Sequence, residues 1–116
     1  MGWRCCDVRF SFGPNTQLVM ITPEGRVKKK VRDYLKSIGC YYFSPVQMGL
    51  GTTTLDDLCC IGGKFVGIEY KAEGKIPTPR QQLTMSQIRR AGGIAVWGDT
   101  SDRVIEEIKK ALGLPD

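Results

Sequence analysis

The sequence predicts an α/β domain in which helices cover both faces of a mixed central sheet. Segments with helical periodicity alternate with short strand-like segments, in the order helix, three strands, helix, strand, helix. Residues 58–61 and 64–71 read as two strands joined by Gly62-Gly63, a two-residue turn that can take positive φ. The second of these strands is apolar on both sides, which is typical of a buried central strand.

The 116 residues have the length of one domain. We expect residues 1–21 to be an N-terminal extension, either a hairpin or a dimer arm, and residues 22–116 to be the folded domain. The apolar runs are short and the N-terminus lacks the hydrophobic region of a signal peptide. We therefore expect a soluble, cytoplasmic protein with no membrane partner.

The first helix should begin at Thr22, a plausible N-cap before Pro23, and end near Gly39. At about 100° per residue, Glu24 falls on the apolar side of this helix. It either stabilises the positive end of the helix dipole or takes part in an inward acidic group. The apolar side itself comprises Val27, Val31, Tyr34, Leu35 and Ile38.

Basic residues are concentrated in the same helix. The chain carries a formal net charge of +5, and five of its Lys and Arg residues fall between positions 26 and 32. Among them, Lys28 and Arg32 border the side of Glu24, and Lys29 lies on an outer face. Such a surface is either simply solvated or contacts a polyanion such as nucleic acid.

The middle of the chain delivers an acidic pair to the hairpin. Residues 41–43 resemble a strand, and residues 44–54 form a loop that leads to Asp56 and Asp57. In the returning strand Phe65, Gly67, Glu69 and Lys71 point to one face, whereas Val66, Ile68 and Tyr70 point to the other.

The last third of the chain supplies two more helices and a strand. A helix from about residue 80 to 91 places Gln81, Met85 and Ile88 on one face. Residues 94–97 are a short buried strand. Ser101 is expected to cap a final helix over residues 102–112, whose core face is formed by Val104, Ile105, Ile108 and Leu112.

Two residue counts exclude large classes of function. The chain has no histidine, which excludes Ser-His-Asp hydrolases, Cys-His proteases and histidine-based nucleases. Its five cysteines lack the spacing of a zinc site, and their odd number does not indicate a disulfide framework. Cys59 and Cys60 lie in a strand that we expect to be buried, as reduced structural thiols.

Polar residues at inward positions suggest a site. A buried charge costs several kcal/mol unless it meets a partner, an ion or a ligand. Carboxylates together supply hard oxygen ligands for Mg²⁺ or Mn²⁺, and a lysine on the same strand face can stabilise negative charge that develops during hydrolysis. The residues concerned are Glu24, Asp56, Glu69, Lys71 and Gln81.

The spacing of Asp56 and Glu69-Tyr70-Lys71 resembles the Asp…Glu-x-Lys core of the PD-(D/E)XK nuclease superfamily. Together with Glu24, Gly62-Gly63, residues 77–81 and residues 91–94, it is similar to the virus-type replication-repair nuclease (VRR-NUC) domain over about residues 22–97. The resemblance implies a restriction-endonuclease-like αβββαβ core, here with an extra C-terminal helix. It also implies an Mg²⁺- or Mn²⁺-dependent endonuclease without a nucleotide cofactor, acting on duplex or branched DNA such as Holliday junctions.

The resemblance also implies roles for single residues. Asp56, Glu69 and the backbone carbonyl of Tyr70 would bind the metal, and Glu24 would complete the site through water or a second ion. Lys71 would activate or stabilise the attacking water, and Gln81 would orient it or the phosphate. We expect contacts with DNA from Lys28, Lys29, Arg32 and Arg80. Stand-alone members of the family are often phage-borne, which would place the protein in a bacterial or phage-infected host cytoplasm. They also tend to form homodimers.

One departure leaves the motif aspartate open. The family usually has proline before it, where this chain has Leu55, so Asp56 is the first choice and Asp57 the second. Two other interpretations stay open as well. The chain could be a nucleic-acid-binding module with the same fold that does not cut, or a small α/β protein whose acids and lysine form structural ion pairs.

Overall fold

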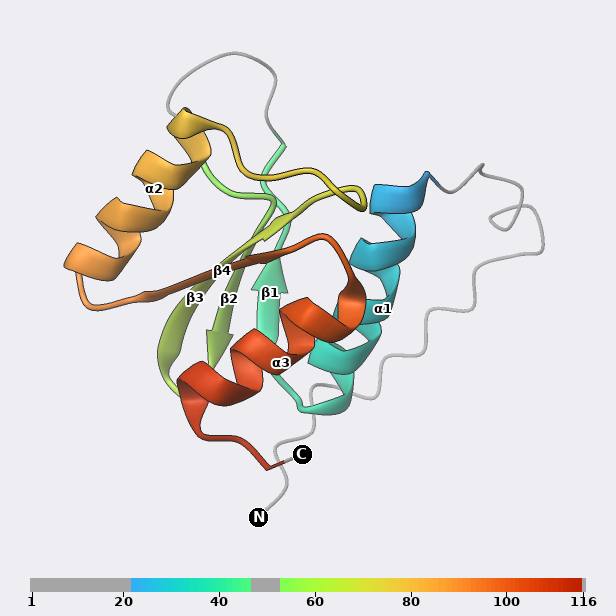
Figure 1. Ribbon diagram of the computed structural model, residues 1–116. Helices are drawn as coiled ribbons and strands as arrows, with labels where there is room; N and C mark the ends of the chain where they lie inside the picture. Colours follow the sequence, from blue (N-terminus) through green and yellow to red (C-terminus); the bar gives the residue numbers. More distant parts are fainter. Residues whose placement is uncertain (1–21, 47–52, 116) are drawn as a thin grey trace.

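The computed structural model describes residues 22–46 and 53–115 (Figure 1). The elements follow the predicted order, with boundaries within about two residues of those expected. They are α1 (Pro23–Ser37), β1 (Tyr41–Phe43), β2 (Asp57–Ile61), β3 (Lys64–Tyr70), α2 (Pro79–Arg90), β4 (Ile94–Gly98) and α3 (Ser101–Leu112).

The four strands form one mixed sheet in the order β1-β2-β3-β4. β1 pairs antiparallel with β2 and β2 with β3, whereas β3 and β4 are parallel. A parallel pair needs a crossover connection, and α2 supplies it. The expected mixed sheet is confirmed, and β3 is the internal strand that its two apolar faces predicted.

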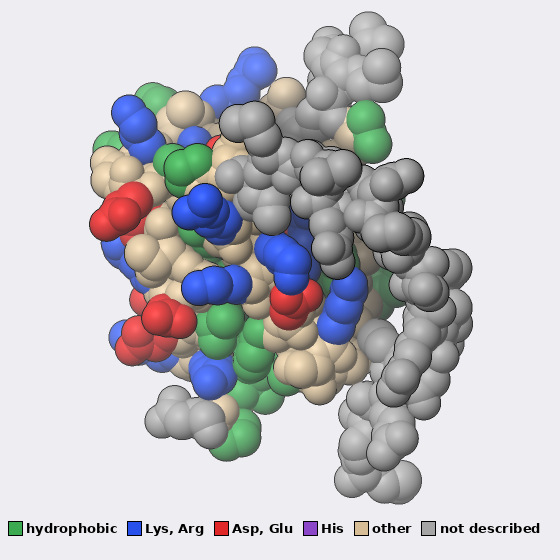
Figure 2. Space-filling view, turned by 90° about the vertical axis from the view of Figure 1, so that its right-hand side faces the viewer, with side chains coloured by type: hydrophobic (Ala, Val, Ile, Leu, Met, Phe, Trp, Pro, Cys, Tyr) green, Lys and Arg blue, Asp and Glu red, His purple; other side chains and the backbone are tan. Residues whose placement is uncertain are grey.

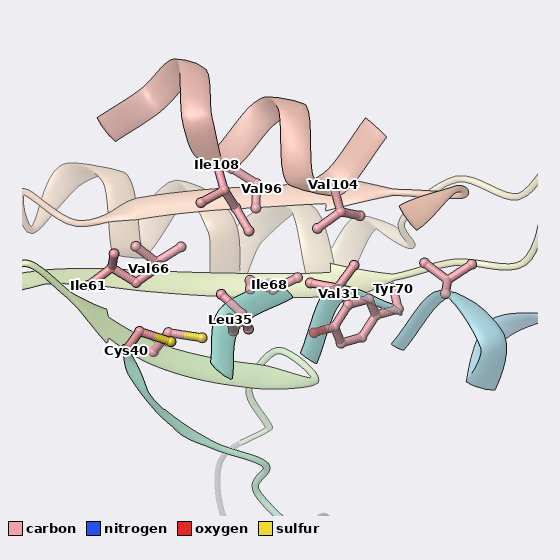
Figure 3. Packing of buried hydrophobic residues seen from close by; sticks show 12 residues of the cluster. Val31, Leu35, Cys40, Ile61, Val66, Ile68, Tyr70, Val96, Val104 and Ile108 are labelled. Atoms are coloured by element: carbon pink, nitrogen blue, oxygen red, sulfur yellow. The ribbon is translucent and has the colours of Figure 1, made fainter. Parts of the chain in front are cut away.

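Helices cover both faces of this sheet. α1 and α3 pack with β3 and β4 in the main core, where side chains from the two helices meet those of the strands (Figure 3). α2 packs on the opposite face, where Met85 meets Leu55 and Ala95. The alternation along β3 therefore sends Val66, Ile68 and Tyr70, all fully buried, into the main core. It turns Gly67 and Glu69 toward the face that carries α2.

The hairpin turn has the predicted conformation, since Gly62 and Gly63 have φ of 56° and 82°. Cys59 is buried, but Cys60 is exposed, so the expectation that both are buried is wrong for Cys60. Consecutive strand residues face opposite sides, and only one side of β2 meets the main core at this point. Neither residue, nor Cys40, forms a disulfide.

The helix caps show one difference from expectation. The hydroxyl of Thr22 accepts a hydrogen bond from the Gly25 amide at 3.0 Å, as an N-cap does. α3, however, is capped by Thr100, whose hydroxyl accepts from the Arg103 amide at 3.2 Å, and Ser101 is the first helical residue. Both hydroxyl residues suit an N-cap, and the extended backbone of Thr100 decides between them.

Part of the sequence lies outside the described residues. This applies to the hairpin or dimer arm expected in residues 1–21 and to most of the loop expected over residues 44–54. Within residues 22–46 and 53–115, no helix has the length and apolar character needed to cross a bilayer.

A close approach of α3 to the end of β4 gives a stability prediction. A Cβ atom at Gly98 would lie 2.6 Å from Val104 Cγ2 and 3.1 Å from the Val104 backbone nitrogen. Gly98→Ala should therefore lower the free energy of unfolding by about 2 kcal/mol in urea denaturation. Gly67→Ala is the control, because the atoms nearest to its Cβ would be the side-chain ends of Ile88 and Leu55, both at 2.8 Å, and not backbone atoms. A larger loss for Gly67→Ala would contradict this account.

Candidate functional site

Two carboxylates, from Asp56 and Glu69, lie together where β2 begins and β3 ends. Asp56 immediately precedes β2, and its Oδ2 accepts a hydrogen bond from the Tyr70 amide at 3.0 Å. The Asp56 amide in turn donates to Glu69 Oε2 at 3.3 Å. Glu69 is only 3% exposed. The two side chains that the sequence predicted as partners are thus held side by side by the backbone of the two strands.

Gln81 and Lys71 contact the same oxygen of Glu69. Gln81 Nε2 donates to Glu69 Oε1 at 2.6 Å, and Lys71 Nζ lies 3.9 Å from that oxygen. Gln81 is also part of the capping box of α2, where its Oε1 accepts from the Thr78 amide at 2.9 Å. Because the cap occupies the oxygen of this amide, its nitrogen is directed at Glu69. The N-terminal cap of α2 therefore holds the Gln81 amide as a donor to the Glu69 carboxylate.

The site raises the proton affinity of Glu69. Burial is the largest cause, the nearby negative charge of Asp56 adds to it, and Lys71 opposes both. The result is a pKa of about 7 for Glu69. The two carboxylates are thus closer and less hydrated than their charges favour, which is a common property of functional sites.

Glu24 is less closely associated with this pair than expected. Its side chain is 41% exposed, and Lys28 Nζ lies 3.9 Å from Glu24 Oε1 and 3.8 Å from Asp56 Oδ1. Within the described part of the chain, no three acidic or cysteine side chains are close enough together to hold one ion. Glu24 therefore faces the site across Lys28 and is not part of a compact set of ligands.

Asp57 takes a different direction from Asp56. It is fully buried and forms an ion pair with Arg32, whose Nη2 lies 2.8 Å from Asp57 Oδ1. Ser44 Oγ and the Tyr70 hydroxyl also donate to it, each at 2.5 Å. Burial would raise the pKa of Asp57, but these hydrogen bonds together lower it below its ordinary value.

This network gives Arg32 a contact that the sequence did not predict. The sequence places it among the nucleic-acid contacts, but its guanidinium is directed at a buried carboxylate and is only 30% exposed. Sequence reasoning did not find the contacts of Ser44 or of the Tyr70 side chain. The available signal was the doubled aspartate together with an arginine at the border of the apolar stripe, since a buried Asp57 would need such a partner.

The other basic residues are distributed around the site. Arg80 is exposed at the rim of a cavity of about 380 Å³, whereas Lys29 pairs with Asp33 at 3.1 Å. On the face that carries α1, Lys and Arg side chains gather with a few acidic ones between them (Figure 2). The cavity itself is lined by Thr53, Thr54, Asp56, Glu69, Thr78, Arg80, Gln81 and Thr84.

The donor set fits a hard divalent cation. Mg²⁺ is usually held by one or two carboxylates together with carbonyl, water or phosphate oxygens. Asp56 and Glu69 provide two such carboxylates beside the cavity, next to the backbone of Tyr70. Their mutual repulsion, which contributes to the raised pKa of Glu69, would be relieved by a cation between them. The residues present are therefore compatible with Mg²⁺ or Mn²⁺.

The pKa of Glu69 predicts a pH-dependent cost of the site. From about pH 4.5 to pH 7 the unfolded chain ionises Glu69 before the folded chain does, so stability falls as pH rises. Glu69→Gln removes this titration. Without divalent ions, its unfolding free energy relative to the wild type should increase by about 3 kcal/mol over that range. Urea denaturation at several pH values measures this, with Glu107→Gln on α3 as the control, and a difference that does not change with pH would contradict it.

Comparison with known proteins places the fold. No protein-family model matches the sequence, and no curated protein matches it. A solved structure described as "VRR_NUC domain" superimposes with a TM-score of 0.65 at 22% sequence identity, over 76% of this chain and 96% of the other. This identity is low, so the likeness shows architecture and not activity. The chain has the fold of a VRR_NUC domain, a restriction-endonuclease-like α/β architecture.

Proposed function

We propose that the protein is a divalent-metal-dependent endonuclease that hydrolyses phosphodiester bonds in DNA. The observation that carries this proposal is that Asp56, Glu69 and Gln81 line one cavity, with the ammonium of Lys71 3.9 Å from Glu69 Oε1. The fold supports it, because the same architecture is found in a solved structure described as a VRR_NUC domain, a nuclease domain by that description. The site also lacks histidine, so the hydrolytic chemistry depends on carboxylates, a lysine and an ion.

Asp56 and Glu69 are the proposed metal ligands, with the backbone carbonyl of Tyr70. When bound, Mg²⁺ or Mn²⁺ supplies positive charge and Lewis acidity at the scissile phosphate. Glu24 lies on the far side of Lys28, 41% exposed, so we assign it an outer role through water or a second ion.

Lys71 and Gln81 are proposed to act on the reacting groups. Lys71 is only 17% exposed and keeps its ammonium beside Glu69 Oε1. There it can stabilise the attacking water as it loses its proton, and the negative charge that develops on the phosphate oxygens. Gln81 holds the orientation of Glu69 through its 2.6 Å hydrogen bond, and can orient water or phosphate with it.

DNA is proposed to approach along the rim of the cavity. Arg80 is on this rim, and Lys28 is 3.8 Å from Asp56, so both can reach phosphates next to the bond that is cut. Lys29 extends the basic surface of α1, and the guanidinium of Arg32 forms an ion pair with Asp57. We further propose that the substrate includes branched DNA such as Holliday junctions and that the protein acts as a homodimer.

Replacement of Lys71 tests the mechanism. Lys71→Met should reduce cleavage of duplex and four-way-junction DNA by about 10²–10³-fold at saturating Mn²⁺, because it removes a group that stabilises the transition state. Lys75→Met is the matched control, since Lys75 is an exposed lysine in the loop after β3. Gel assays of cleavage with Mn²⁺, Mg²⁺ and EDTA measure the effect.

Equal rates in Lys71→Met and the wild type would exclude the proposed role of the lysine. DNA binding by the wild type without cleavage in either ion would favour the alternative of a binding module that does not cut.

Replacement of Arg80 tests the path of the DNA. Arg80→Ala should weaken binding similarly for all sequences and reduce the slope of log affinity against log salt by about 0.9, the value for one lost phosphate contact on duplex DNA. Arg90→Ala is the control, because Arg90 is at the other end of the same helix, about 15 Å away. Salt titrations in EDTA measure both slopes, and equal changes in the two variants would refute this path.

A further inference from the structure

We propose that Tyr70 is a positioning residue for the proposed metal ligands, acting through a partly buried hydrogen-bond network on the face of the sheet that carries α1. We call this network the Asp57 clamp, and it consists of Arg32, Ser44, Asp57 and Tyr70. The inference rests on the proposed function, because it concerns how Asp56 and Glu69 are held for an ion.

The clamp gives Asp57 a single orientation. Arg32 donates from Nε to Asp57 Oδ2 at 2.9 Å and from Nη2 to Oδ1 at 2.8 Å, which is the two-pronged arrangement that guanidinium and carboxylate favour. Ser44 Oγ adds a donor to Oδ1, and the Tyr70 hydroxyl adds one to Oδ2. Asp57 and Tyr70 are both fully buried, so the bond between them is shielded from water, whereas Arg32 reaches Asp57 from the partly exposed side of α1.

Asp56 needs such support because of its place in the sheet. The first residue pair of the β2–β3 ladder is Asp57 with Ile68, so Asp56 stands just before the ladder begins. A side chain on a loop is held less firmly than one within a strand. Asp56 and Asp57 share a peptide bond, and fixing the Asp57 side chain therefore also fixes the backbone from which the Asp56 side chain extends.

Tyr70 joins the two sides of this arrangement. Its amide donates to Asp56 Oδ2 at 3.0 Å, and its hydroxyl donates to Asp57 Oδ2 at 2.5 Å. Tyr70 also stands between Glu69 and Lys71 in the chain, and these two side chains contact each other beside Asp56. One residue thus connects the clamp to both proposed ligands and to the lysine.

A positioning role and a purely stabilising role have different consequences. An ion pair that only stabilises the fold changes the melting temperature without changing how well an ion binds. A clamp that positions the ligands changes ion affinity as well, as partners of metal ligands usually do. Tyr70→Phe separates the two, because it removes one hydroxyl and no charge, and therefore leaves the long-range electrostatics of the site unaltered.

The experiment is calorimetric titration of the full chain with Mn²⁺ at pH 8. Tyr70→Phe should weaken Mn²⁺ binding about tenfold, the lower end of the range for such partners. DNA binding in EDTA should stay unchanged. Arg32→Lys keeps the charge but loses the bidentate bond to Asp57, so it should weaken Mn²⁺ binding by a similar factor. The double variant should lose less Mn²⁺ affinity than the product of the two single-variant factors, because the two residues act as one unit.

Ile108→Val is the matched control for a general loss of stability. Ile108 is fully buried in the same core but lies on α3, away from Tyr70 (Figure 3). It should lower the melting temperature without a change in Mn²⁺ affinity. Unchanged affinity in both Tyr70→Phe and Arg32→Lys, or an equal loss in Ile108→Val, would overturn the positioning role and leave the proposed nuclease intact. Absence of Mn²⁺ binding by the wild type would overturn the proposed nuclease itself.

Discussion

The central constraint on this structure is that it holds two carboxylates closer together, and less hydrated, than their charges favour. Glu69 is 3% exposed beside Asp56, and burial together with this neighbour raises the pKa of Glu69 to about 7. The surrounding fold supplies the compensation: an amide from Gln81, the ammonium of Lys71, and the Asp56 amide itself. The energy that maintains this arrangement comes from the apolar core on the other side of β3, since hydrophobic burial is the main favourable contribution to folding.

The two adjacent aspartates show how different the surroundings of one residue type can be. Asp57 receives donors from Arg32, Ser44 and Tyr70, and its pKa is lowered although it is fully buried. Asp56, one residue earlier, lies beside a cavity with a second carboxylate. A satisfied buried acid is typical of structural support, whereas an acid that faces another acid is typical of a site for a cation.

The sequence predicted that Asp56, Glu69, Lys71 and Gln81 lie close together, but it did not predict the contacts of Glu24 and Arg32. Glu69 and Lys71 follow from strand alternation, and Gln81 from helical spacing, because both periodicities fix the direction of a side chain locally. Glu24 and Arg32 were placed correctly on α1, but the helical angle does not tell how far α1 stands from the sheet. At that distance, Lys28 lies close to both Glu24 and Asp56, and Arg32 forms an ion pair with Asp57.

The sequence by itself determined the order of the elements, the turn at Gly62-Gly63 and the internal position of β3. Each of these depends on periodicity or backbone freedom within a few residues. Only the tertiary structure decided between Asp56 and Asp57 as the partner of Glu69. Both aspartates precede the same strand, and their roles differ because Arg32 from α1 and Ser44 after β1 reach one of them and not the other. Contacts between segments distant in sequence made that distinction, and no local pattern encodes them.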